Sequence, residues 1–175
     1  MSLGDASGQA AMRATAHPVR LRIMSLLTGA PMTAAEVARE LGLTHANASY
    51  HLRHLHAAGM IVVAGEEKIR GGVAKRYRYD RARDRLSETP EQKRALFATL
   101  GHELIRRTAT GQFESKILLG DGEFWIEPDK WLDLRRRFMD LLGELHDAAQ
   151  PPRTPGTIHT STTVAMFEME SPDEQ

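Results

Sequence analysis

The sequence predicts a mainly α protein with small β elements, an α+β chain in two parts. Two short helices joined by a tight turn at residues 33–59, followed by a β-prone hairpin at residues 60–79, indicate the first part. A second half of long amphipathic helices and short β-prone stretches indicates the other. We therefore expect domains at residues 9–86 and 87–170, with a charged connector at residues 80–88 where they meet.

The chain is expected to open with a helix at residues 9–16 and a second helix that begins at Pro18. Proline suits the first position of a helix, because the N–H that it lacks would have no partner there. His17 stands at the boundary between the two helices, and we expect a core residue there rather than a ligand. The aliphatic residues expected to enter the core are Leu21, Ile23, Met24, Leu26 and Leu27.

Residues 33–59 carry the start and stop signals of two consecutive helices. Thr33 and Glu36 are spaced as a capping box, and Gly42, which has no Cβ, suits the end of that helix. Thr44 is expected to cap the next helix, which Gly59 would end. One face of this second helix carries Ala48, Leu52 and Leu55 at helical spacing, which predicts a buried stripe.

The opposite face of the second helix is polar. Its side chains can donate or accept hydrogen bonds at base edges in a DNA major groove: His45, Asn47, Ser49, Tyr50 and Arg53. Taken alone, the same two helices also fit a helical hairpin with a solvated polar face. The residues that follow favour the first interpretation.

A short β-prone run at residues 60–64 is followed by a polar, glycine-bearing loop at residues 65–75 and by a returning strand at residues 76–79. Five cations lie on the predicted loop and returning strand: Lys68, Arg70, Lys75, Arg76 and Arg78. The hairpin would therefore present positive charge beside the polar helix. Helix, turn, helix and basic hairpin, in that order, form a winged helix.

Residues 12–80 resemble the ArsR-type winged helix-turn-helix transcriptional regulators. Residues 14–27 are similar to the family's "HPxRxxIL" helix, and residues 49–61 to its "SxHLxxLxxAGL(V/I)" recognition helix. The resemblance implies a homodimer that binds double-stranded DNA at a palindromic operator, with repression as the family habit. One departure is that this chain has no cysteine, whereas the founding arsenic and cadmium sensors use cysteine thiolates.

On this reading the residues expected to face DNA are Thr44, His45, Asn47, Ser49, Tyr50, Arg53, Lys68, Arg70, Lys75 and Arg76. The recognition helices of the two subunits would lie about one helical turn apart, ~34 Å, with the hairpins against the flanking backbone or minor groove. The alternative from another class is a winged helix kept as a protein-interaction module without DNA binding.

Composition narrows the remaining classes. The absence of cysteine in 175 residues excludes disulfides, thiolate metal sites and thiol redox sensing. With no long apolar run and no signal-peptide pattern, we expect no membrane span and a cytoplasmic protein. The net charge of zero hides an uneven distribution, since basic residues predominate in residues 1–86 and acidic residues in residues 87–175. The basic half coincides with the predicted winged helix, which suits a phosphate-bearing partner.

The second half begins with Thr89 and Pro90 as a helix start. A second helix is expected from Pro128, and strands are expected at residues 123–126 and 157–169. Apolar residues recur at i, i+4 and i+8 on the first helix, a stripe suited to packing, and at heptad spacing on the second. Together they predict a dimer interface: Leu96, Leu100, Leu104, Trp131, Leu134, Phe138, Leu141 and Leu145. The alternative is that these helices pack only on the core of their own domain.

No catalytic arrangement is visible in the second half. There is no nucleophile with a partnered base, no glycine-rich phosphate loop and no pair of carboxylates on a shared face, so we expect no enzyme and no cofactor. Residues 101–106 superficially resemble a zinc-peptidase motif, but position 106 is arginine where the second histidine is needed, so no metal is expected. A cavity for an unknown small-molecule effector among the aromatic residues of this half stays open as an alternative.

Overall fold

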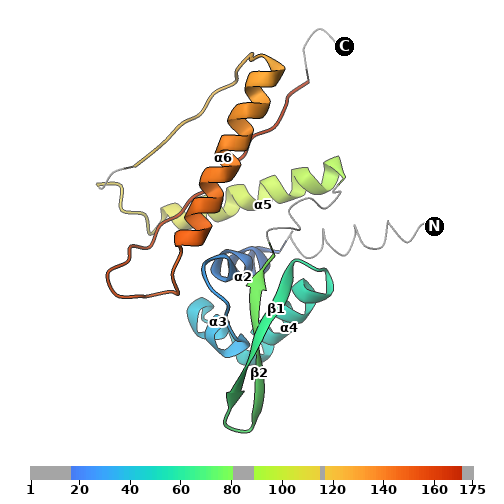
Figure 1. Cartoon of the computed structure of the whole chain (residues 1–175), viewed down its shortest axis with the longest axis vertical. Coiled ribbons are helices and arrows are strands. Elements are labelled where there is room, and N and C mark those ends of the chain that lie inside the picture. Colours follow the sequence, from blue (N-terminus) through green and yellow to red (C-terminus); the bar gives the residue numbers. More distant parts are fainter. Residues whose placement is uncertain (1–16, 81–88, 115–116, 171–175) are drawn as a thin grey trace, which may run out of the picture.

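The computed structural model describes residues 17–80, 89–114 and 117–170. The helix expected at residues 9–16 and most of the connector expected at residues 80–88 lie outside this part of the chain. The elements are α2 (Pro18–Gly29), α3 (Ala34–Leu41), α4 (His45–Ala57), β1 (Ile61–Ile69), β2 (Gly72–Tyr79), α5 (Pro90–Thr108) and α6 (Pro128–Ala148). Figure 1 shows α2, α3, α4 and the hairpin gathered into one unit, with α5 and α6 crossing beside it. Both of these long helices contact α2.

The caps that the sequence predicts are present at α3 and α4. The Thr33 hydroxyl accepts a hydrogen bond from the Glu36 N–H at 3.3 Å, and the Glu36 carboxylate accepts one from the Thr33 N–H at 2.7 Å. The Thr44 hydroxyl accepts from the Asn47 N–H at 3.2 Å. Gly42 and Gly59 adopt φ angles of 66° and 71°, a left-handed conformation that a Cβ would strain. The turn between the helices and the end of α4 are therefore fixed by local sequence.

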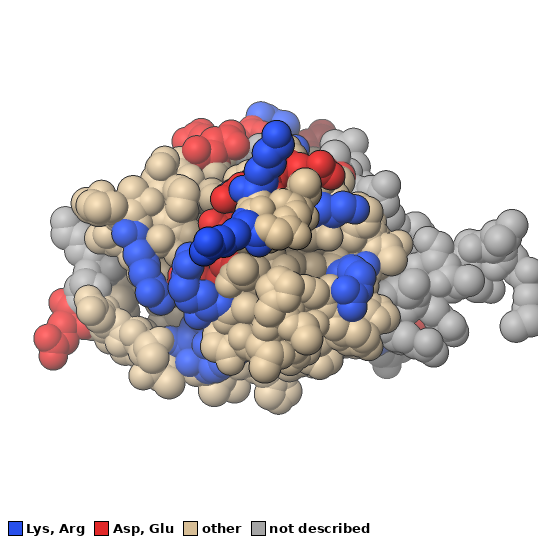
Figure 2. Space-filling view, turned by 90° about the horizontal axis from the view of Figure 1, so that it is seen from below, with Lys and Arg blue, Asp and Glu red and all other residues tan. Residues whose placement is uncertain are grey.

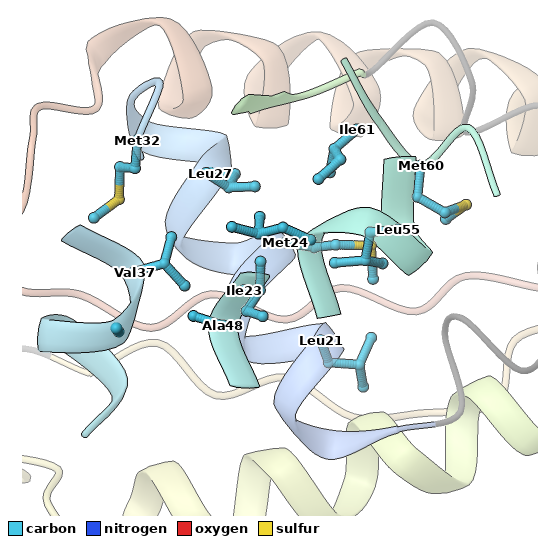
Figure 3. Packing of buried hydrophobic residues seen from close by; sticks show 12 residues of the cluster. Leu21, Ile23, Met24, Leu27, Met32, Val37, Ala48, Leu55, Met60 and Ile61 are labelled. Atoms are coloured by element: carbon cyan, nitrogen blue, oxygen red, sulfur yellow. The ribbon is translucent and has the colours of Figure 1, made fainter. Parts of the chain in front are cut away.

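The hydrophobic core lies where α2, α3, α4 and the start of β1 meet (Figure 3). Its fully buried large side chains are Ile23, Leu27, Val37, Leu52, Leu55 and Ile61. The predicted stripe of α4 is confirmed, since Ala48, Leu52 and Leu55 are all buried, and Leu26 is only partly buried. The prediction for His17 is wrong in part: it is exposed and caps α2, its Nδ1 accepting a hydrogen bond from the Val19 N–H at 3.2 Å.

The hairpin is longer than the sequence suggested. Strands β1 and β2 pair antiparallel from Ile61 opposite Tyr79 to Ile69 opposite Gly72, with an irregularity between Val63 and Gly65. The loop expected at residues 65–75 is therefore wrong, because only residues 70 and 71 connect the strands. Backbone pairing does not require apolar side chains when both faces of a ribbon are solvated, so polar residues continue the ladder. A bridge between Met32 and Tyr77 ties the hairpin to the segment before α3.

The predicted fold class is confirmed, with five helices and one two-stranded hairpin in the described residues. Helices α5 and α6 begin at the two prolines that the sequence marks. The strands expected at residues 123–126 and 157–169 are wrong, since neither segment joins a sheet within the described chain. A strand needs a neighbour for its backbone groups, and β-propensity does not supply one. None of the described helices combines the length and hydropathy that a membrane crossing requires.

Candidate nucleic-acid interface

The polar face of α4 points away from the core because the opposite stripe is fully buried. His45, Asn47 and Arg53 are exposed on it, Tyr50 is 47% exposed, and Ser49 is only half-buried. Thr44 is exposed at the start of the helix, where its hydroxyl is used as a cap. The structure thus presents most of the predicted set on one rigid face of a helix that is anchored by its own stripe.

The Tyr50 ring does not stand alone on this face. It lies against His54, with ring centroids 4.4 Å apart, and near His51 at 5.4 Å. Packing against two imidazoles limits the rotamers open to the phenol ring. A polar side chain that is already ordered loses less entropy when it meets a ligand.

Four of the five hairpin cations are exposed: Lys68, Arg70, Lys75 and Arg78. Figure 2, which views the molecule from the hairpin end, shows a band of Lys and Arg side chains across this face with acidic side chains mixed into part of it. The pairing register explains part of that mixture, because Glu66 stands opposite Lys75. The hairpin is therefore less uniformly basic than the spacing of its cations suggested.

Arg76 differs from the other hairpin cations. One guanidinium nitrogen donates to the Glu67 carboxylate at 2.6 Å, while the other donates to the Pro31 carbonyl at 2.6 Å and lies 3.5 Å from the Glu36 carboxylate. Burial of Glu36 opposes its ionisation, but the hydrogen bonds from Thr33 and the charges of Arg76 and Arg39 outweigh that effect and lower the pKa of Glu36. Arg76 thus holds the hairpin against the start of α3, a role that sequence reasoning missed because it depends on residues far apart in the chain.

A buried polar contact supports α4 from beneath. His51 is only 5% exposed, and its Nδ1 accepts a hydrogen bond from Nε of the buried Arg20 at 3.4 Å. The His17 ring lies 4.9 Å from the His51 ring. Burial, together with the nearby charges of His17, Arg20 and His54, lowers the pKa of His51, so the neutral imidazole is favoured. Sequence reasoning missed Arg20, although its spacing three residues after His17 places both on one face of α2.

The eight residues expected at a dimer interface do not share one surface. Leu96 and Leu100 of α5 are partly buried against the winged-helix core, whereas Leu104 is 44% exposed. On α6, Trp131 and Leu134 are half-buried. The remaining members of the α6 series are exposed: Phe138, Leu141 and Leu145. Leu96 and Leu100 thus pack within their own chain, as the alternative held. For the apolar series of α6, a dimer interface stays a prediction.

One cavity of about 230 Å³ lies where α2, β2 and the end of α6 meet. Its lining residues are Thr28, Gly29, Arg78, Tyr79, His146, Asp147 and Ala149. The sequence left open a cavity among the aromatic residues of the second half. None of those residues lines this cavity, and Phe124 and Trp125 are each 81% exposed. In the described ranges, no group of three His, Asp or Glu side chains is arranged to hold a metal ion.

Comparison with known proteins agrees with the fold. Residues 15–64 match the family model HTH_20, described as a helix-turn-helix domain. No curated protein sequence matches the chain.

Three solved structures are similar to the chain. A possible transcriptional regulator for arsenical resistance is 25% identical over 58% of this chain and 96% of its own, with a TM-score of 0.34. HlyU from Vibrio cholerae N16961 is 21% identical over 63% and 100%, with a TM-score of 0.35. An ArsR-like transcriptional regulator from Rhodococcus sp. RHA1 is 23% identical over 63% and 92%, with a TM-score of 0.39. Residues 15–64 thus match a helix-turn-helix domain family, and the β1–β2 hairpin that follows completes a winged-helix arrangement.

Proposed function

We propose that this protein is a sequence-specific DNA-binding transcriptional regulator that acts as a homodimer on a palindromic operator. The observation that carries the proposal is the polar face of α4, most of which is exposed and which a fully buried stripe fixes beside a cation-bearing hairpin. A helix of this kind fits the major groove, where side chains with donors and acceptors distinguish base pairs. The helix-turn-helix family match supports the same assignment.

In the proposed complex, α4 of each subunit is the recognition helix and lies in the major groove. Its polar residues contact base edges and nearby phosphates: Thr44, His45, Asn47, Ser49, Tyr50 and Arg53. Three hairpin cations meet the flanking backbone: Lys68, Arg70 and Lys75. Arg76 is left out of this set, because its guanidinium is engaged by Glu67, Glu36 and the Pro31 carbonyl. Because repression is the habit of the ArsR-type regulators that the chain resembles, we propose repression.

The part of the chain after the connector serves dimerisation in this proposal. The exposed seam of α6, at Phe138, Leu141 and Leu145, supports that role because three large apolar side chains at heptad spacing face outward. A two-fold dimer would place two α4 helices on the same side of a DNA duplex. Residues 17–80 would then read the DNA and residues 89–170 would set their spacing.

One of the similar structures is that of a possible transcriptional regulator for arsenical resistance. Arsenite is bound in proteins through thiolates, and this chain has no cysteine. Arsenic sensing is therefore not part of the proposal, and an effector, if one acts here, has a different chemistry.

The proposal is tested by footprinting the full-length protein on DNA that flanks its own gene. We expect two protected half-sites related by a dyad, with centres about one helical turn apart. A mobility-shift titration against scrambled DNA of the same length measures the preference. Equal affinity for both DNAs, with no protected dyad, would favour the protein-interaction module instead.

A further inference from the structure

Exposed apolar side chains are concentrated in the second half of the described chain. The winged helix exposes few large ones, namely Tyr50, Val63, Ile69 and Val73. By contrast, Leu118, Leu119, Phe124 and Trp125 are each at least 81% exposed, and Ile158 is 84% exposed. Large exposed apolar side chains concentrated in this way indicate an interaction surface, because their contact with water is unfavourable.

Two segments supply much of this surface and share a second property. Residues 117–126 and 158–169 are rich in β-branched and aromatic residues, yet the backbone of neither makes a hydrogen bond to another part of the described chain. Each therefore combines the composition of a strand with an unpaired strand edge. Such an edge is a template for pairing with another chain.

The segment at residues 158–169 is held in place near its end. The Trp131 indole N–H on α6 donates to the Glu168 carboxylate at 3.1 Å, and the Phe97 ring on α5 lies 5.4 Å from the Phe167 ring. Figure 1 shows residues 117–126 leading to the start of α6 and residues 158–169 crossing that helix. The segment at residues 158–169 is thus anchored to both α5 and α6 close to its C-terminal end.

We propose that a second copy of this chain occupies this surface, and that residues 117–126 and 158–169 become strands of a sheet that the two subunits build together. The proposal rests on the homodimer of the proposed function and names how its subunits join. Obligate homodimer interfaces are more apolar than the rest of a protein surface, and the exposed apolar residues of α6 and of the two segments fit that composition. A two-fold axis brings the same patch of each subunit together, so one partner covers helix and strands at once.

Charge favours a second copy over a strongly acidic or basic partner. Residues 154–167 contain no Lys, Arg, Asp or Glu, so two copies of this stretch can lie side by side without opposing like charges. A surface that awaited an acidic or basic partner would carry the complementary charge.

The test uses two adjacent proline substitutions in the full-length protein, Thr162→Pro and Thr163→Pro, with Thr162→Ala and Thr163→Ala as matched controls. Successive N–H groups of a strand point to opposite edges, so at least one of the two prolines removes a paired donor if the segment is a strand. In a solvated coil, both prolines are tolerated. We expect one proline variant or both to raise the dimer dissociation constant by at least about tenfold, and both alanine variants to leave it within about twofold.

Hydrogen exchange on the wild-type protein gives an independent reading. Amides at residues 158–167 should be protected above the dimer dissociation constant and exchange freely after dilution below it. Unchanged protection of α4 in each variant shows that the winged helix is folded. A dimer that still footprints the operator, but whose 158–167 amides exchange freely and whose proline variants dimerise normally, would overturn this inference and leave the proposed function standing. A full-length protein that stays monomeric at all concentrations and binds no operator would overturn both.

Discussion

Arg53 and Arg76 carry the same charge, but the fold uses them differently. Arg53 is exposed on α4, so its planar fork is free to meet a guanine edge or a phosphate. Arg76 sits in a half-buried position where two carboxylates and a carbonyl surround it. Sequence alone placed both among DNA-facing cations, because an arginine in a basic stretch looks the same in either role.

Arg53→Ala tests base reading directly. If the guanidinium pairs with guanine, the change should weaken the free energy of operator binding by about 1–3 kcal/mol. It should also relax the base preference at one base pair in each half-site. Binding to scrambled DNA should weaken much less. The matched control is Arg94→Ala on α5, which removes the same charge from a side chain that is 71% exposed. Equal losses on operator and scrambled DNA would make Arg53 a phosphate anchor.

His51 gives the winged helix a pH dependence whose sign can be worked out. Its pKa in the folded protein is lowered below the ordinary 6.5, so the unfolded chain binds more protons between the two values. The free energy of unfolding should therefore fall as pH drops below about 6.5 and be unaffected by this group at higher pH. Urea titrations of the wild type and of His51→Gln between pH 5 and pH 8, at about five pH values, would measure it.

The control for that experiment is His56→Gln, since His56 is exposed on the same helix. We expect the His56 variant to keep the wild-type pH profile and the His51 variant to flatten it. A wild-type profile in the His51 variant would assign the acid sensitivity to other groups.

At the scale of elements, the apolar spacing of α6 predicts a packed face, but part of that face is exposed in the single chain. Its apolar series has heptad spacing, but within the described chain Phe138, Leu141 and Leu145 remain 43%, 53% and 46% exposed. Helices with such a bare seam pack against a partner in coiled-coil fashion. Helix α5 shows the contrast, because Leu96 and Leu100 find the winged-helix core in their own chain.

Phe138→Gln should weaken the dimer, because it replaces a large apolar side chain in the middle of the seam with a polar one. A rise in the dimer dissociation constant of at least about tenfold is expected. Sedimentation of the full-length protein over a concentration series measures it. Arg137→Gln, one residue away on an exposed position, is the control and should leave dimerisation unchanged. Equal behaviour of the two variants would contradict a role for the α6 seam.

For the whole molecule, the separation of charge between the halves would determine how DNA attracts the protein in the proposed complex. The basic part holds the reading helix and hairpin, so phosphate binding should be local and salt-dependent. Glu66 and Glu67 on the hairpin reduce this field close to the DNA. Fewer cations than the sequence suggested are therefore available to the phosphate backbone.

Lys75→Ala should reduce affinity for all DNA sequences alike and make the salt dependence shallower. Each phosphate contact contributes about 0.9 to the slope of log affinity against log salt, so a dimer that loses two contacts should lose nearly two units. Lys93→Ala, an exposed lysine of α5, controls for net charge. A loss of only one unit would indicate that a single hairpin of the dimer touches DNA, and an unchanged slope would remove Lys75 from the interface.

The sequence by itself determined the local architecture of the winged helix. The capping box at Thr33, the turn at Gly42 and the stripe of α4 all depend on residues within a turn or two of each other, so their spacing in the chain is their spacing in space. The same holds for the starts of α5 and α6 at proline. For this reason the polar face of the candidate site could also be predicted.

Only the tertiary structure decided the rest, because the rest depends on partners far along the chain. The contact of Arg20 with His51 spans 31 positions, and that of Arg76 with Pro31 spans 45. Residues 123–126 and 157–169 fail as strands in the described chain for the complementary reason, since their composition is suitable and no neighbouring strand is present. A helix satisfies its own backbone within the segment, whereas a strand requires a second one, and sequence pattern reports only on the segment itself.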